Sequence, residues 1–127
     1  RIARKRLDAG LKKRHANDTM PPMHVTSAKN LDLIKGSKNL RTGDISFSPE
    51  GFGPNRAGGE AIRVKPTSRR NVHFMKDDAG GWVPKYYENG IEYLPNGEVN
   101  ILKGKNYIPL EHLQHFDKDA GRWVGFK

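Results

Sequence analysis

His-Val-Thr-Ser at 24–27 and Asp-Ile-Ser-Phe-Ser at 44–48 are the two stretches that decide the expected fold. The first predicts a short strand followed at once by a helix, with the Ser27 hydroxyl as the helix cap. The second alternates polar and apolar residues, so Ser46 and Ser48 share one side of a strand. Two polar strand ends are therefore expected to lie side by side, with the histidine at the strand edge.

The rest of the chain predicts an α+β domain built mainly from antiparallel sheet. Asn-Gly at 89–90 and 96–97 marks hairpin turns, and 14 glycines with 8 prolines favour many turns over a helical bundle. We expect two or three short helices, including 27–35 and a turn that starts at Ile108. Strand-like runs occupy 23–26, 44–48, 61–65, 71–76, 82–87, 91–94, 98–102, 114–117 and 122–126.

Charge separates a basic N-terminal arm from the body. Residues 1–14 hold seven basic and one acidic side chain, a net charge of +6, so the other 113 residues carry only +3 of the total +9. We assign 1–21 to a cationic helix or arm, either a linker or a nucleic-acid contact, and 22–127 to one folded domain. The chain has no apolar run long enough to span a membrane.

Several classes of chemistry are excluded by motifs that the sequence lacks. With 0 cysteines there is no disulfide, thiolate nucleophile or cysteine-ligated zinc. There is also no phosphate loop, no dinucleotide-binding Gly-x-Gly-x-x-Gly and no His-Glu-x-x-His. His112 and His115 are three residues apart, a spacing that one helical face can hold, but they lack a third ligand at a metal-site spacing, so we expect no metal.

Glu92 and Glu98 are the acidic residues that the pattern favours for chemistry. They flank the turn at 96–97, and Asn-Tyr-Ile-Pro-Leu-Glu follows at 106–111. With the histidine strand first and the serine strand second, this order resembles the small ADP-ribosyltransferases, in particular the C-terminal toxin domains of bacterial polymorphic toxins. The resemblance covers roughly residues 22–113.

This resemblance implies that NAD is the substrate and that a carboxylate stabilises an oxocarbenium-like transition state. One site then requires the first strand and the hairpin at 91–102 to be neighbours in the sheet. The implied catalytic residues are Glu98, Glu92, Ser46 and Ser48, and the implied NAD-binding residues are His24, Thr26 and Phe52.

The resemblance further implies a toxin used in interbacterial competition. Such a domain is secreted or delivered by a larger carrier protein and acts in the target-cell cytoplasm. Its target is a protein or an RNA, and its producer carries an acidic immunity protein.

Two other functions fit the sequence. A metal-independent ribonuclease toxin of the barnase-like or colicin-like kind takes its general base and acid from His24, His73, Glu92 and Glu98. The other is a non-enzymatic structural protein of a ribosome or virion, in which cationic arms with proline-rich tails are common.

Deletion of residues 1–14 is predicted to leave a folded, active domain, because the arm has only a narrow apolar stripe and two prolines separate it from the body. Thermal unfolding of the truncated protein checks this. A loss of its cooperative transition would show that the arm belongs to the core.

Overall fold

A computed structural model describes residues 23–43, 45–48, 59–78 and 81–126. These residues form a small, mainly antiparallel α+β domain, which confirms the predicted fold class. The arm at 1–21 and most of the loop that contains Phe52 lie outside the described residues. The elements are β1 (Met23–Thr26), α2 (Ala28–Lys35), β2 (Asn39–Arg41), β3 (Glu60–Val64), η1 (Pro66–Asn71), β4 (Val72–Lys76), β5 (Trp82–Tyr86), η2 (Ile101–Lys103), β6 (Tyr107–Pro109), η3 (Leu110–His112), β7 (Leu113–Asp117) and β8 (Arg122–Gly125).

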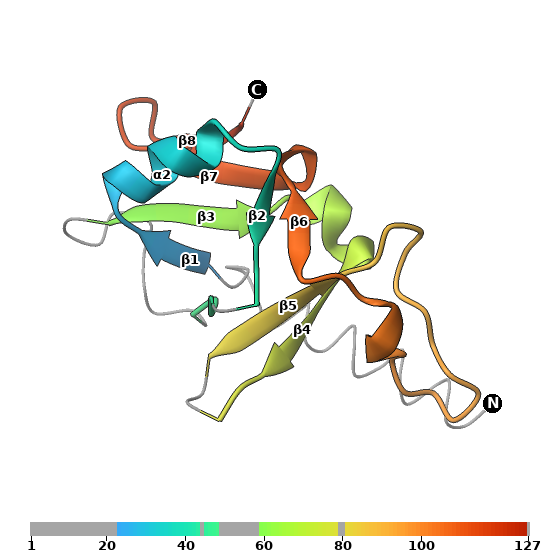
Figure 1. The fold of residues 1–127 in the computed structure, drawn as a ribbon. Helices are drawn as coiled ribbons and strands as arrows, with labels where there is room; N and C mark the ends of the chain where they lie inside the picture. Colours follow the sequence, from blue (N-terminus) through green and yellow to red (C-terminus); the bar gives the residue numbers. More distant parts are fainter. Residues whose placement is uncertain (1–22, 44, 49–58, 79–80, 127) are drawn as a thin grey trace.

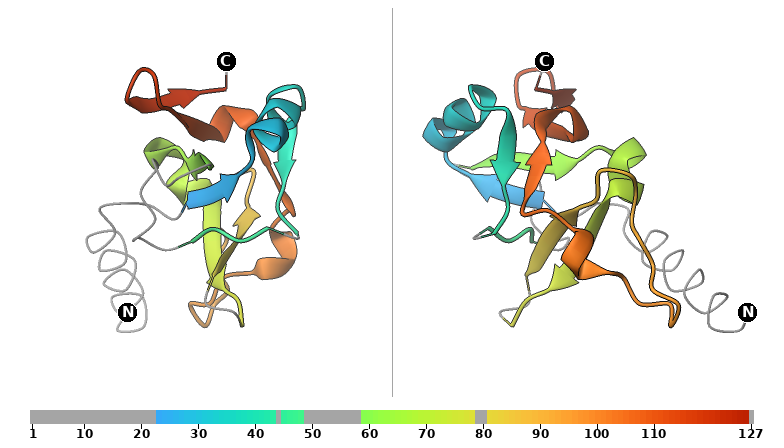
Figure 2. Two further views of the ribbon diagram at one scale, coloured as in Figure 1. Left: turned by 90° about the vertical axis from the view of Figure 1, so that its left-hand side faces the viewer. Right: turned by 45° about the vertical axis from the view of Figure 1, so that its right-hand side comes forward.

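The described strands form three antiparallel sheets. One has four strands in the order β1-β3-β7-β8, and the other two are the pairs β2-β6 and β4-β5. Strands β1, β3 and β7 run across the direction of β2 and β6 (Figure 1). The two turned views show the β4-β5 hairpin extending away from the four-stranded sheet (Figure 2). None of the described helices is long and apolar enough to cross a membrane.

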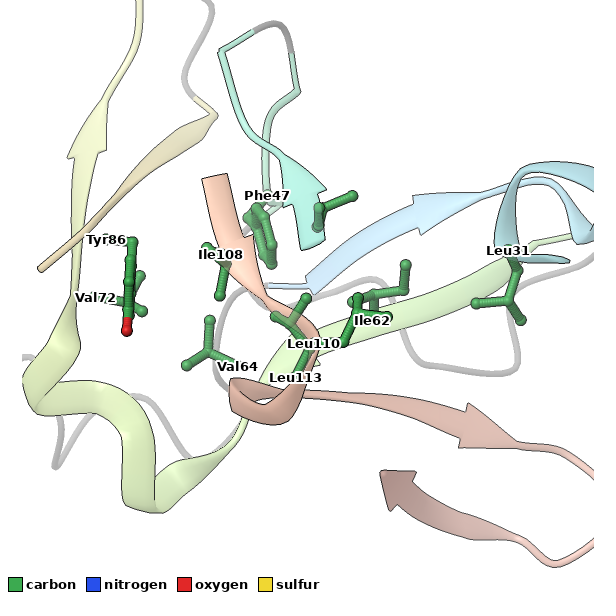
Figure 3. Close-up of a cluster of buried hydrophobic side chains, with 10 residues drawn as sticks. Leu31, Phe47, Ile62, Val64, Val72, Tyr86, Ile108, Leu110 and Leu113 are labelled. Atoms are coloured by element: carbon green, nitrogen blue, oxygen red, sulfur yellow. The ribbon is translucent and has the colours of Figure 1, made fainter. Parts of the chain in front are cut away.

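The core lies where these sheets meet (Figure 3). Phe47, Ile62, Ile108 and Leu113 are each 0% exposed, and they come from the 45–48 segment and from β3, β6 and β7. Complete burial of such a side chain stabilises the fold by about 1.5–3 kcal/mol. Packing among distant segments, and not any single element, therefore holds this domain together.

Helix α2 follows its sequence signals closely. The Ser27 hydroxyl accepts a hydrogen bond from the backbone N–H of Asn30 at 3.1 Å, and Gly36 ends the helix. Leu31 faces the core and is 5% exposed. The predicted cap and stop are both confirmed.

The strands predicted at 44–48, 91–94 and 98–102 are not formed as regular strands. Within 45–48 only Phe47 and Ser48 pair, each through an isolated bridge, and the hairpin predicted at 91–102 keeps one bridge, Tyr93 to Val99, before η2 begins. These segments pair too briefly to form regular ladders. The short strands β2 and β6 were not predicted, because three-residue strands carry no readable alternation.

His115 is half-buried on β7, and its ring lies 5.1 Å from that of Phe126. Burial is the main cause that lowers its pKa below 6.5, and the charge of Lys35 adds to this, while Asp117 and Glu60 oppose it. The neutral ring is therefore the form that the folded state favours.

Stability is predicted to fall as the pH drops below about 6.5, because the unfolded chain then binds a proton that folded His115 resists. Tm should decline more steeply between pH 7.5 and 5 in the wild type than in His115→Gln. Equal declines in the two proteins would contradict this assignment.

Candidate functional site

The edge of β1 carries a polar cluster, here called the His24 cluster: His24, Ser46, Asp77 and Gly81. The backbone N–H of Met23 donates to the Ser48 carbonyl at 3.1 Å, and the Ser48 N–H donates back at 2.6 Å. The predicted neighbourhood of the histidine strand and the serine segment is thus confirmed.

The imidazole of His24 is held by the backbone. Its Nδ1 lies 3.0 Å from the carbonyl oxygen of Ser46. A carbonyl only accepts, so Nδ1 carries the proton and Nε2 is left as an acceptor in the neutral ring. The half-buried ring also packs against Phe47, with 5.8 Å between ring centroids. Its orientation is therefore fixed while Nε2 can accept a hydrogen bond from a ligand hydroxyl.

A carboxylate lies next to the serine. The Ser46 hydroxyl donates to Oδ2 of Asp77 at 3.2 Å, and the N–H of Gly81 donates to Oδ1 at 2.7 Å. Asp77 directly follows β4, at the start of the connection to β5, and its backbone N–H donates to the Gly81 carbonyl. An ionised carboxylate has about four acceptor positions, so two bonds leave it able to accept from a ligand.

Asp77 is the site residue that sequence reasoning missed. The run Asp-Asp-Ala-Gly-Gly at 77–81 indicates a hairpin turn, and it lies between the paired strands β4 and β5. The carboxylate reaches Ser46 because Phe47 pairs with Trp82 through two backbone hydrogen bonds of 2.6 and 2.8 Å. No sequence signal gives that long-range pairing.

Gly81 is closely packed inside this cluster. A Cβ at this position would lie 2.9 Å from the Ser46 Cβ and 3.0 Å from Oδ2 of Asp77. Only glycine lets the β5 backbone approach the serine and the carboxylate this closely. The spacing of the cluster thus depends on a missing side chain.

The prediction that the strand of His24 and the hairpin of Glu92 and Glu98 are neighbours in one sheet is wrong. Strand β1 pairs with β3 and Ser48, whereas the hairpin carrying Glu92 and Glu98 belongs to none of the three sheets. That hairpin is anchored elsewhere, since the N–H of Ile91 donates to the Arg70 carbonyl at 2.9 Å. In Figure 1, β1 and the segment between β5 and η2 lie on opposite sides of the fold. Both glutamates are exposed.

The remaining predicted site residues are Thr26, Ser48 and Phe52. Thr26 is half-buried on the same face of β1 as His24, two residues along the strand. Ser48 is half-buried and uses its backbone to pair with Met23. Phe52 lies outside the described residues.

A second polar cluster is internal. Nδ1 of His112 lies 2.8 Å from the Ser68 hydroxyl, and its Nε2 lies 3.3 Å from the Tyr86 hydroxyl. Ser68 and Tyr86 are 6% and 5% exposed. Because both ring nitrogens are engaged by buried groups, this histidine joins η1, β5 and η3 rather than facing a substrate. His112 and His115 do not share a helical face, since His115 belongs to β7.

The described residues contain no group of three or more histidine, aspartate or glutamate side chains able to hold a metal ion. Comparisons with protein-family models, curated proteins and solved structures find no match. Function is therefore inferred from the His24 cluster.

Gly81→Ala is predicted to destabilise the domain by about 1–3 kcal/mol, the usual cost of forcing a methyl group into a packed site. Gly43→Ala is the matched control, because a Cβ added at Gly43 would meet no atom within 4 Å. Urea unfolding of both variants makes the comparison. A Gly81→Ala variant as stable as the Gly43→Ala control would show that the site can widen freely.

Proposed function

We propose that this chain is a toxin-type mono-ADP-ribosyltransferase that binds NAD at the His24 cluster. The observation that carries the proposal is the row of three groups at one sheet edge: His24 Nδ1 is 3.0 Å from the Ser46 carbonyl, and the Ser46 hydroxyl is 3.2 Å from the Asp77 carboxylate. A histidine, a serine hydroxyl and a carboxylate are the groups that the resemblance leads us to expect for this reaction. Here Asp77 takes the place that the sequence suggested for Glu92 or Glu98.

Each group has a distinct part in the chemistry. In the reaction the bond between ribose C1′ and the nicotinamide nitrogen breaks, its electron pair leaves with neutral nicotinamide, and positive charge develops on the ribose. Asp77 accepts a hydrogen bond from a ribose hydroxyl and stabilises that charge, while Ser46 holds the carboxylate in place. Nε2 of His24 accepts a hydrogen bond from a hydroxyl of the ribose on the adenosine side of NAD. The acceptor then adds at C1′ and loses a proton.

The ribonuclease alternative has less support from the geometry. It draws a general base and acid from His24, His73, Glu92 and Glu98, which come from β1, β4 and the hairpin around 96–97. A general acid and base must face one phosphate within hydrogen-bond reach. The His24 cluster, by contrast, is linked through one residue: the imidazole of His24 contacts the Ser46 carbonyl, and the Ser46 hydroxyl donates to Asp77.

Nicotinamide release from NAD tests the assignment. Asp77→Asn keeps an oxygen for the Gly81 N–H but removes the charge, so it should lower kcat roughly a hundredfold or more. His24→Ala should mainly raise KM for NAD. The double variant Glu92→Gln, Glu98→Gln is the control and should retain wild-type turnover.

Full activity in Asp77→Asn, or loss of activity in the glutamate double variant, would return the carboxylate role to the hairpin. Wild-type protein that releases no nicotinamide and gains no Tm with NAD, but cleaves RNA, would establish the ribonuclease alternative. Growth arrest on cytosolic expression in bacteria, relieved by Asp77→Asn, would support the toxin assignment.

A further inference from the structure

The four-stranded sheet has one face toward the core and one face away from it, here called the outer face. Ile62, Val64 and Leu113 belong to the buried cluster of Figure 3, so their side of β3 and β7 faces the core. Because side chains alternate between the two faces of a strand, Arg63 and its register partner Gln114 lie on the outer face. Phe116 follows two residues after Gln114 on β7, and its partner on β8 is Trp123. Strands β3, β7 and β8 thus place an arginine, an amide and two aromatic rings on one surface.

These four side chains contact one another, and they are here called the Trp123 platform. Cζ of Arg63 lies 4.6 Å from the centroid of the Trp123 ring, within the range of a cation–π interaction. The rings of Phe116 and Trp123 meet edge to face, with 5.4 Å between their centroids and 75° between their planes. Nε of Arg63 donates to Oε1 of Gln114 at 2.9 Å. Contacts from three strands therefore hold the guanidinium and the two rings in fixed orientations.

The positive charge of the platform has no carboxylate beside it on the outer face. The acidic residues within these four strands are Glu60 and Asp117, and the register places both on the core-facing side. Burial lowers the pKa of the Arg63 guanidinium, and the positive charge of Arg69 on η1 lowers it further. All four platform side chains are half-buried, so part of each is exposed to solvent. The platform therefore favours a ligand that brings negative charge to a partly exposed cation.

Single-stranded nucleic acid has the two groups that this surface can bind. Each of its nucleotides carries a flat base, which stacks on aromatic rings and on guanidinium planes, and a negative phosphate. One N–H of Arg63 donates to Gln114, and the other N–H groups of the guanidinium can donate to a phosphate oxygen. An acidic peptide also supplies negative charge, but it has no flat ring at each unit to stack on the platform. The combination of stacking surface and cation thus favours an unpaired nucleotide.

We propose that the Trp123 platform binds single-stranded nucleic acid. An unpaired base stacks on the exposed part of the layer formed by Trp123 and Arg63, and the neighbouring phosphate accepts hydrogen bonds from the Arg63 guanidinium. His24 pairs with Ile62 in the register and lies on the core-facing side of the sheet. The platform and the His24 cluster are therefore on opposite faces, and this inference does not rest on the proposed NAD chemistry.

Fluorescence anisotropy of a labelled oligo(dT) of about ten nucleotides tests the platform on the full chain at one fixed salt concentration. The wild type should bind it about tenfold or more tightly than an abasic oligonucleotide of the same length, because the abasic strand has the same phosphates but no bases to stack. Any phosphate contact of the basic residues 1–14 adds equally to both affinities. The difference between the two probes therefore reports stacking alone.

Arg63→Gln and Lys76→Gln compare two cations that each lie over a tryptophan ring. Nζ of Lys76 lies 5.3 Å from the centroid of Trp82, in the separate β4-β5 sheet. Both substitutions remove one positive charge, yet Arg63→Gln should weaken oligo(dT) binding about tenfold and Lys76→Gln less than about twofold. Trp123→Leu should abolish the preference for oligo(dT) over the abasic strand. Near-ultraviolet circular dichroism verifies that each variant is folded.

Three results would each overturn the proposal. They are equal affinities of the wild type for the two oligonucleotides, equal effects of Arg63→Gln and Lys76→Gln, and a folded Trp123→Leu variant that keeps the wild-type preference. Poly-glutamate that binds as tightly as oligo(dT), and loses this binding in Arg63→Gln, would assign the platform to an acidic protein instead.

Discussion

Two backbone pairings, Ser48 with Met23 and Phe47 with Trp82, join the four-stranded sheet to the β4-β5 hairpin. Ser48 is hydrogen-bonded to Met23 at the start of β1, and Phe47 is hydrogen-bonded to Trp82 at the start of β5. Two residues thus connect the four-stranded sheet to the β4-β5 hairpin. Because the Phe47 side chain is 0% exposed, the same link is fixed by core packing.

The chemistry of the candidate site follows from that link. Phe47 is buried while its neighbour Ser46 is exposed, so the Ser46 side chain lies outside the core. The hairpin turn then brings Asp77 to the serine hydroxyl, and the absence of a side chain at Gly81 lets the two backbones approach. Packing of one aromatic residue therefore orders a row of polar groups at the surface.

Two surface regions of the molecule differ in how they are built. The His24 cluster joins segments that are distant in sequence and is positioned by backbone hydrogen bonds and a buried ring. The segment that carries Tyr93, Leu94, Ile101 and Leu102 is local in sequence and leaves these apolar side chains exposed to water. It is separate from the sheet that contains β1.

The local features could be predicted from the sequence: the strand at 23–26, the Ser27 cap, the turns and the α+β class. Each depends on neighbouring residues, whose alternation, capping and turn chemistry can be read directly. The identity of the carboxylate beside Ser46 came instead from the tertiary structure. Glu92 and Glu98 occupy a plausible position in the chain order, yet the hairpin that carries them is anchored at Arg70, while Asp77 is brought in by the Phe47–Trp82 pairing. Such pairing depends on how buried side chains from distant segments pack together, and no single stretch of sequence contains that information.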